Sequence, residues 1–307
     1  MNAAPDSAAR DSAGPDSAAH GELRLPPRRY STLRVQLFRW TQRLLERLGA
    51  RRFYRAWALA PGKFEVRRER VEVQDLPADL DGLRVVQWSD LHAGPYLGPR
   101  SLDAVVEATA QLQPDLFVLT GDYITEVVDE GLFLGEVFGR VQPRLGSFAV
   151  FGNHDYRERR EAELETAYAG AGVRFLRNRT VHLEVGSASL AITGLEDVEE
   201  GRGDPGEALE GLRPGEPRLV LVHNPYVAER LDAPDVVAVL SGHTHGRQVN
   251  VPPVRWFAPQ HPGDRRTLPS GAVSLVSRGL GALGLPLRLA ARADVVCLEL
   301  KRAEVSA

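Results

Sequence analysis

The chain has 307 residues, 43% of them hydrophobic, and a single cysteine, Cys297. This apolar content is enough for a substantial core, while one cysteine excludes a disulfide framework or a thiolate metal site within the chain. Any bound metal must therefore use His, Asp, Glu or Asn. The net charge of −3 hides an asymmetry, because residues 24–55 contain ten arginines and one glutamate, a local charge of +9.

The N-terminal 22 residues contain "PDSAA" twice and lack the apolar content that folding requires, so residues 1–22 are predicted to be a disordered tail. Residues 23–60 form a separate, basic segment. Its arginine pairs, Arg28-Arg29 and Arg51-Arg52, are not followed by the roughly 7–15 apolar residues of an export signal, and no segment approaches a transmembrane length. A cytoplasmic protein is expected, with peripheral association at the inner face of the membrane as an option.

That option comes from an apolar stripe in the basic segment, which has helical spacing. The stripe consists of Leu33, Leu37, Trp40, Leu44 and Leu48. Arginines fall largely off it, and Phe38, Phe53, Tyr54 and Trp57 are close by. Through residues 31–57 such a helix could lie on an anionic membrane surface, or its stripe could pack on the main domain or on another copy. Nucleic acid is not an expected partner, because no reader fold is recognisable.

Residues 61–307 show strands and helices in alternation, which predicts an α/β domain with a largely buried sheet. Phe64 to Val73 alternates like an antiparallel strand, and helices are expected over Ser101 to Leu112, with Ser101 as N-cap, and over Arg157 to Ala169. Trp88 is expected in the core, and His182 and His261 on the surface. Further strands are predicted at residues 83–88, 115–120, 147–152, 188–194, 218–223, 236–242, 273–279 and 295–300.

The stretch "SGHTHGRQVN" places His243 and His245 just past a Val-rich strand, where open α/β sheets carry their ligand sites. One intervening residue on extended backbone directs the two rings to opposite sides, so they could serve two metal ions or bracket one loop. A turn with two polar rings is the alternative for this motif alone.

Polar residues follow four other predicted strands in the same way. They are Asp90, His92, Asp122, Asn153, His154, Asp155 and His223. Any one cluster is explained as a cap or a turn, but five clusters at strand ends indicate a metal centre. Carboxylate, imidazole and amide ligands suit Mn²⁺, Fe or Zn²⁺ and disfavour copper or iron–sulfur chemistry.

The ordered motifs D-x-H, G-D, G-N-H-[DE], H and G-H-x-H resemble the calcineurin-like binuclear metallophosphoesterases. The wording "VVQWSDLHAG", "HNP", "GHTHGRQ" and "SRGLGALGLPLRL" is most similar to the bacterial YkuE-like subgroup, which includes members acting on phospholipid head groups or on UDP-diacylglucosamine. The resemblance implies a four-layer α/β/β/α sandwich with the active site at the carboxyl ends of the strands.

The resemblance also implies the roles of individual residues. Asp90, His92 and His245 would hold one metal, Asn153, His223 and His243 the other, and Asp122 would bridge them. His154 would stabilise developing charge or protonate the leaving group, and Asp155 would orient its ring.

The implied activity is hydrolysis of a phosphate ester or pyrophosphate by a hydroxide held between two divalent ions, with Mn²⁺ expected first and Fe or Zn²⁺ as alternatives. The substrate would be a phosphorylated small molecule or lipid head group, of the phosphodiesterase or UDP-2,3-diacylglucosamine pyrophosphatase type. A non-catalytic scaffold with the same fold is the alternative, although degenerate scaffolds lose ligands and every ligand position here holds a suitable residue.

Two positions depart from the family pattern. Thr125 stands where many members carry an aspartate, so a supporting carboxylate is missing or is supplied by Glu126. Arg247 replaces a glycine, so it is strained if its φ is positive, and otherwise it is a solvated residue or reaches a substrate phosphate. Arg278 could bind phosphate or pair with surface carboxylates, and Asn178 could touch substrate or make a turn.

Overall fold

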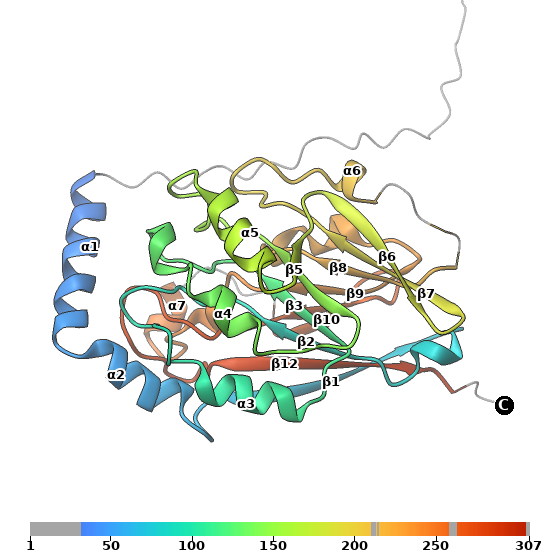
Figure 1. The fold of residues 1–307 in the computed structure, drawn as a ribbon, viewed down its shortest axis with the longest axis horizontal. Coiled ribbons are helices and arrows are strands. Elements are labelled where there is room, and N and C mark those ends of the chain that lie inside the picture. The colour runs from blue at the N-terminus through green and yellow to red at the C-terminus, as the bar shows by residue number, and fades with distance from the viewer. Residues whose placement is uncertain (1–31, 210–212, 214, 258–262, 305–307) are drawn as a thin grey trace, which may run out of the picture.

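The computed structural model describes residues 32–209, 213, 215–257 and 263–304. The predictions for residues 1–22 and for His261 lie outside these residues. Two mixed sheets of six strands each form the centre of the molecule (Figure 1). The first sheet has the order β1 (Glu65–Val73), β12 (Asp294–Arg302), β2 (Arg84–Trp88), β3 (Leu116–Thr120), β4 (Gly146–Val150) and β5 (Val173–Phe175). The second has the order β10 (Arg265–Thr267), β11 (Val273–Val276), β9 (Val236–Ser241), β8 (Arg218–Leu221), β7 (Ala188–Gly194) and β6 (Arg179–Val185).

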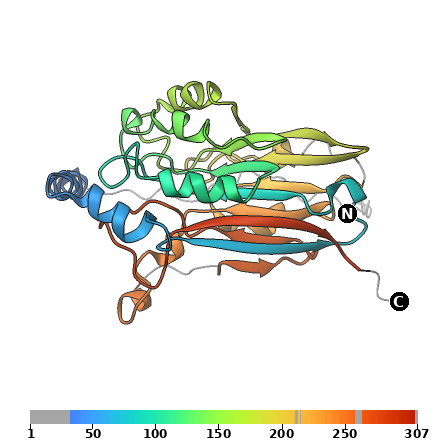
Figure 2. The same ribbon diagram turned by 60° about the horizontal axis from the view of Figure 1, so that its bottom comes forward.

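The helices lie on the outer faces of the sheets and at one end of the molecule (Figures 1 and 2). The α-helices are α1 (Thr32–Arg47), α2 (Ala50–Tyr54), α3 (Asp103–Gln111), α4 (Leu134–Phe138), α5 (Glu161–Ala169), α6 (Pro205–Leu209) and α7 (Val254–Phe257). The π-helix η1 (Arg55–Leu59) follows α2, and short 3₁₀ segments are η2 (Ala78–Leu80), η3 (Val128–Glu130), η4 (Pro225–Leu231) and η5 (His245–Arg247). None of the described helices has both the length and the apolar content needed to cross a membrane.

Alternation along each buried strand divides the core into layers. In β3, Leu116 and Val118 pack between the two sheets, whereas Phe117 and Leu119 face the layer that includes α3, α4 and α5. The outer face of the second sheet packs against η4 and α6. The architecture is therefore the expected α/β/β/α sandwich, and Trp88 lies fully buried in its core.

Both sheets contain a run of parallel strands. β2, β3, β4 and β5 are parallel in the first sheet, and β7, β8, β9 and β11 in the second. Parallel strands bring their carboxyl ends to a common edge, and the loops that carry the polar motifs begin there.

Some sequence-based predictions were wrong in detail. β1 was predicted to be an antiparallel strand, but it pairs parallel with β12. Its alternation of buried and exposed residues reflects its place at the edge of the sheet and not its direction. α3 begins at Asp103, and the Ser101 hydroxyl accepts a hydrogen bond from the Gly98 amide instead of capping the helix. α5 begins four residues later than predicted, at Glu161. The strands β5, β6 and β10 were not predicted at all.

Candidate metal centre

The strand ends of both sheets deliver the predicted metal-binding side chains to one place. Asp90 and His92 follow β2, Asp122 follows β3, and Asn153 and His154 follow β4. From the second sheet, His223 follows β8, and His243 and His245 follow β9. The centre therefore lies where the edges of the two sheets meet.

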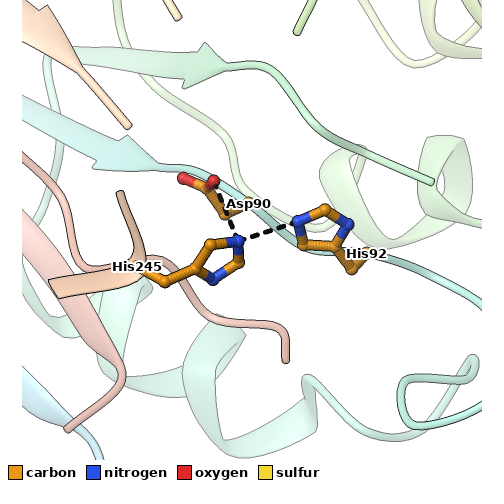
Figure 3. Close-up of side chains that lie close together, drawn as sticks. All are labelled: Asp90, His92 and His245. Carbon is orange, nitrogen blue, oxygen red and sulfur yellow. Dashed lines mark hydrogen bonds and ion pairs between the residues drawn. The ribbon is translucent and has the colours of Figure 1, made fainter. Parts of the chain in front are cut away.

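One group of side chains consists of Asp90, His92 and His245, all buried (Figure 3). The Nε2 atoms of His92 and His245 are 3.0 Å apart, and the His245 Nε2 atom lies 3.4 Å from Asp90 Oδ1. The two rings stack with their centroids 4.8 Å apart. Three potential ligand atoms thus face a common point.

A second group consists of Asp122, His223 and His243. Asp122 Oδ2 is 3.3 Å from His223 Nε2, which in turn is 3.2 Å from His243 Nδ1. The same carboxylate oxygen lies 3.5 Å from His92 Nε2 in the first group. Asp122 therefore stands between the two groups, and the rings of His243 and His245 belong to different groups.

These residues fit a pair of divalent cations. Two imidazole nitrogens 3.0 Å apart can share at most one hydrogen bond, whereas a cation accepts the lone pairs of both. The Oδ1 atom of Asn153 is buried and receives no hydrogen bond from any described residue, which leaves an oxygen available as a ligand. The donor set of imidazole, carboxylate and amide oxygen matches borderline and hard divalent metals.

The protonation of the histidines is set by burial and by Asp122. Burial lowers the pKa of His92 and of His245 well below the usual range, so both rings are neutral at pH 7 and can donate lone pairs. Burial also acts to lower the pKa of His223, but the adjacent Asp122 carboxylate outweighs it and raises that pKa well above the usual value. Without a cation, His223 and Asp122 form a buried ion pair.

Five of the predicted ligands have backbone in the left-handed region. The φ angles are 50° at Asp90, 46° at His92, 56° at Asp122, 71° at His243 and 52° at His245. Such residues cost on the order of 1–3 kcal/mol each and persist only where the surroundings impose them, most often at functional sites. The loops are also closely packed, since a side chain at Gly242 would collide with Ser89 and Asp90.

Groups behind the ligands fix the orientation of their rings. His243 presents its Nε2 atom to Glu199 at 3.2 Å, and His223 presents Nδ1 to the Thr120 carbonyl at 2.7 Å. A carboxylate or carbonyl in this place holds a ligating histidine in one orientation and increases its basicity. Sequence reasoning missed Glu199, although it follows the end of β7 as the other motifs follow their strands.

Arg288 was also missed. Its buried guanidinium donates to the carbonyl of Gly281 and lies 3.3 Å from His245 Nδ1. Nothing in the local pattern "GLPLRLAARA" distinguishes this arginine from Arg292, which binds the backbone around Lys63. Its role depends on the path of the loop that precedes β12.

His154 lies beside the first group. Its ring packs edge-on against His92, with centroids 4.8 Å apart, while Nδ1 lies 2.7 Å from the Thr125 carbonyl and Nε2 3.3 Å from Arg157 Nη2. Its backbone amide donates to Asp122 Oδ1 at 2.9 Å. Burial lowers the pKa of His154, which keeps the ring neutral at pH 7.

The predicted role of Asp155 is wrong. Its carboxylate does not reach the His154 ring, because the Thr125 carbonyl already occupies Nδ1. It accepts backbone N–H groups instead, from Gly152, Asp122, Tyr123 and Ile124. Asp155 therefore holds the β3 loop, which carries Asp122, against the β4 loop.

The departures from the family pattern have separate consequences. The Thr125 hydroxyl donates to the His92 carbonyl at 3.1 Å, so it fastens the backbone of a ligand without supplying a carboxylate. Glu126 lies 3.3 Å from Arg157 and 2.9 Å from Arg39 of α1, and it supports the arginine next to His154 instead of a ligand. Arg247 has φ 67°, so the expectation of strain for a positive φ applies.

Other predicted residues prove to be structural. Arg278 lies 3.0 Å from Asp264 and 2.9 Å from Glu65, which agrees with the ion-pair interpretation. The Asn178 side chain fastens a turn by donating to the Arg202 carbonyl and accepting from the Glu196 amide. His182, expected on the surface, is half-buried and pairs with Glu216 at 2.7 Å.

Comparison with known proteins agrees with this geometry. Residues 83–247 match the profile of the family described as calcineurin-like phosphoesterase. The chain is 32% identical to "Transmembrane protein with metallophosphoesterase domain" from Danio rerio over 76% of this chain and 56% of that protein. It therefore spans little more than half the length of that relative.

Two bacterial relatives are covered over most of their length. The chain is 29% identical to "Uncharacterized metallophosphoesterase YkuE" from Bacillus subtilis over 79% of this chain and 87% of the relative. It is 30% identical to "Phosphodiesterase YaeI" from Escherichia coli over 78% of this chain and 89% of the relative. The family match covers the strand-end motifs from Asp90 to His245, whose side chains the fold brings together. The chain belongs to the calcineurin-like phosphoesterase family.

Proposed function

We propose that the chain is a hydrolase of phosphoric diester or phosphoanhydride bonds that depends on two divalent cations. Asp90, His92 and His245 hold one cation, and Asn153, His223 and His243 hold the other. Asp122 bridges them. The observation that carries this proposal is the position of Asp122 Oδ2, within 3.5 Å of an imidazole from each group.

When bound, such cations polarise phosphoryl oxygens and lower the pKa of water. The chain's own contribution is to place a buried imidazole and fixed positive charge next to that centre. His154 carries its proton on Nδ1, toward the Thr125 carbonyl, so Nε2 must take up a proton before the ring can protonate the leaving oxygen. Arg157, 3.3 Å from the ring, fixes its position and attracts phosphate oxygens. His154 is buried, whereas Arg157 is exposed and so is open to a phosphate that arrives from solvent.

We propose manganese as the bound metal, with Fe or Zn²⁺ as alternatives, and the donor set argues against magnesium. Four of the seven proposed ligands are imidazoles, and Mg²⁺ prefers an all-oxygen environment. We expect Mn²⁺ to restore more activity to the metal-free protein than Mg²⁺ does. Turnover that EDTA leaves unchanged would overturn the metal-dependent mechanism.

For the substrate, we propose a lipid-linked or nucleotide-linked phosphate. The name of the Escherichia coli relative, a phosphodiesterase, supports a diester. The test is hydrolysis of bis-p-nitrophenyl phosphate, p-nitrophenyl phosphate and UDP-2,3-diacylglucosamine by the full chain loaded with Mn²⁺. A preference for either of the first and last compounds over the monoester supports the proposal, and a preference for the monoester contradicts it.

The competing function is a scaffold that keeps the fold without catalysis. The intact set of seven ligand candidates and His154 argues against it, because the loss of catalysis removes the constraint on ligands. Tight binding of two manganese ions without hydrolysis of any of the three compounds would favour the scaffold.

A further inference from the structure

Exposed apolar side chains are concentrated at one end of the described molecule. Of its twelve exposed large apolar residues, all but Tyr226 lie within residues 33–57 or 254–289, and they include three of the four tryptophans. We call these the apolar face. It comprises Leu33, Leu37, Trp40, Leu44, Leu48, Phe53, Trp57, Val254, Trp256, Leu285 and Leu289.

The segments that carry the apolar face are joined to one another. Phe38 of α1 packs beside Gly284, and the Trp57 indole donates to the Arg288 carbonyl at 3.3 Å. The Asn250 amide donates to the Leu289 carbonyl at 2.8 Å, which connects the segment before α7 to the same loop. Figures 1 and 2 place α1 and α2 together at one end of the molecule, and Figure 1 places α7 toward that end. The segments that carry the face, α1, α2, η1, α7 and the 280–289 loop, are therefore neighbours at this end of the molecule.

Helix α1 is fastened through the side opposite its stripe. Gln42 is buried, Leu45 packs against the core, and Arg39 pairs with Glu126 at 2.9 Å. Leu33 and Trp40 are 76% and 61% exposed. The stripe thus faces away from the domain, so the interpretation that it packs on its own domain is wrong.

The same surface is strongly cationic. Between residues 32 and 59 the only acidic residue is Glu46, and it pairs with Arg51 at 2.6 Å. Exposed arginines accompany the stripe at positions 43, 47, 52 and 55, while Arg39 is paired with Glu126 on the other side of α1. A two-fold contact between copies through this face would bring two arginine-rich surfaces together, which is unfavourable.

We propose that the apolar face docks onto an anionic phospholipid bilayer. Leucine and tryptophan side chains enter the boundary between head groups and acyl chains, where tryptophan is favoured because its ring is apolar and its N–H polar. The arginines meet lipid phosphates, to which guanidinium groups bind in bidentate fashion. Docking combines the burial of apolar side chains with the electrostatic attraction between arginine and lipid phosphate, and neither needs a helix that spans the membrane.

Docking would bring the metal centre close to the lipid head groups. Trp57 contacts Arg288, whose guanidinium lies 3.3 Å from His245. Arg39 reaches His154 through Glu126 and Arg157. If the proposed hydrolysis is correct, phosphates at the membrane surface are the substrate class that this placement favours; docking itself does not depend on hydrolysis.

The experiment is co-sedimentation of the full chain with vesicles of phosphatidylglycerol and phosphatidylcholine, and with phosphatidylcholine alone, at low and high salt. We expect binding to the anionic vesicles that weakens with salt. The double variant Leu37→Glu/Trp40→Glu should abolish it. Arg43→Gln/Arg47→Gln should weaken partitioning by about 25-fold, at about fivefold for each arginine near the surface.

Tyr226→Ala, at an exposed aromatic residue outside the apolar face, is the matched control and should bind as the unaltered chain does. Circular dichroism and hydrolysis of bis-p-nitrophenyl phosphate check that each variant is folded, and the arginine pair tests the proposal even if the glutamate pair fails to fold.

Unchanged sedimentation of both double variants, or equal binding to neutral vesicles, would overturn docking. A dimer in analytical ultracentrifugation that Trp40→Glu dissociates would assign the face to a second copy instead. Sedimentation without hydrolysis would support docking and refute only the proposed enzymatic function.

Discussion

His154 is held on three sides, and with His92 and Asp122 it forms a further cluster of potential ligand atoms. Its Nδ1 faces the Thr125 carbonyl, its amide donates to Asp122, and its Nε2 faces Arg157. We expect His154→Ala to retain both metal ions while lowering kcat by about 10²- to 10⁴-fold, the usual contribution of a general acid. Metal content by elemental analysis and kcat from steady-state kinetics test this. A variant that loses metal would show that His154 is a ligand.

The role proposed for Asp122 depends on the negative charge of its carboxylate. Its Oδ2 lies within reach of both groups, and Oδ1 accepts the His154 amide. Asp122→Asn keeps the shape but removes the negative charge between the proposed cations, so it should lower metal affinity and activity more than His92→Ala, which removes one ligand of one cation. Isothermal titration with Mn²⁺ measures the affinity. Equal losses in the two variants would contradict the bridging role.

The residues that contact the proposed metal ligands from behind were the hardest to find from sequence. The ligands stand in motifs directly after strands, so alternation and glycines reveal them. Glu199 and Arg288 act through loops whose course depends on the packing of the whole domain. Asp155 shows the converse error, since adjacency to His154 suggested a contact that the Thr125 carbonyl had already taken.

At the scale of elements, buried strands were predictable and exposed or short ones were not. β3 and β9 are continuous apolar runs that end at polar motifs, because both faces of each strand are covered. β6 reads "RTVHLEV" and is only partly buried, and β5 and β10 have three residues each, too few for a periodic signal. For β1 the alternation reported exposure at the sheet edge, whereas its direction depends on pairing with a strand more than 200 residues away.

Helix α1 depends on its ion pair with the body for its position. Arg39 is about half exposed and Glu126 nearly buried, so their pairing is worth on the order of 1 kcal/mol or less after screening by solvent. We expect Arg39→Ala to increase hydrogen exchange of the α1 amides several-fold. Arg47→Ala, at an exposed arginine two turns further along α1, is the matched control. Equal exchange in the two variants would show that apolar contacts alone hold the helix.

At the scale of the molecule, the metal centre joins the two sheets. Asp90, His92 and Asp122 come from loops of the first sheet, and His223, His243 and His245 from loops of the second. Cations held between them stabilise the packed arrangement of the sheets by mass action, about 2.7 kcal/mol at a hundredfold excess over Kd. We expect removal of metal by EDTA to lower the Tm by roughly 5 °C or more.

Differential scanning calorimetry of the metal-loaded and metal-free chain measures this change, and Asp122→Asn serves as the control that should respond little to EDTA. An equal response of the variant and the unaltered chain would mean that the stabilising ions bind elsewhere.

The left-handed backbone of five predicted ligands lowers the stability of the fold at the positions that the proposed activity needs. Glycine adopts a positive φ without strain, so it would remove the conformational strain at those positions. The proposed need to bind metal accounts for the aspartate and histidine residues that stand there instead. A laboratory population of this chain selected for heat resistance in the presence of a chelator, where metal binding adds no stability, should therefore accumulate substitutions at these loops early. Lineages that must also cleave phosphate should gain their resistance elsewhere, in the surface helices and the sheet edges.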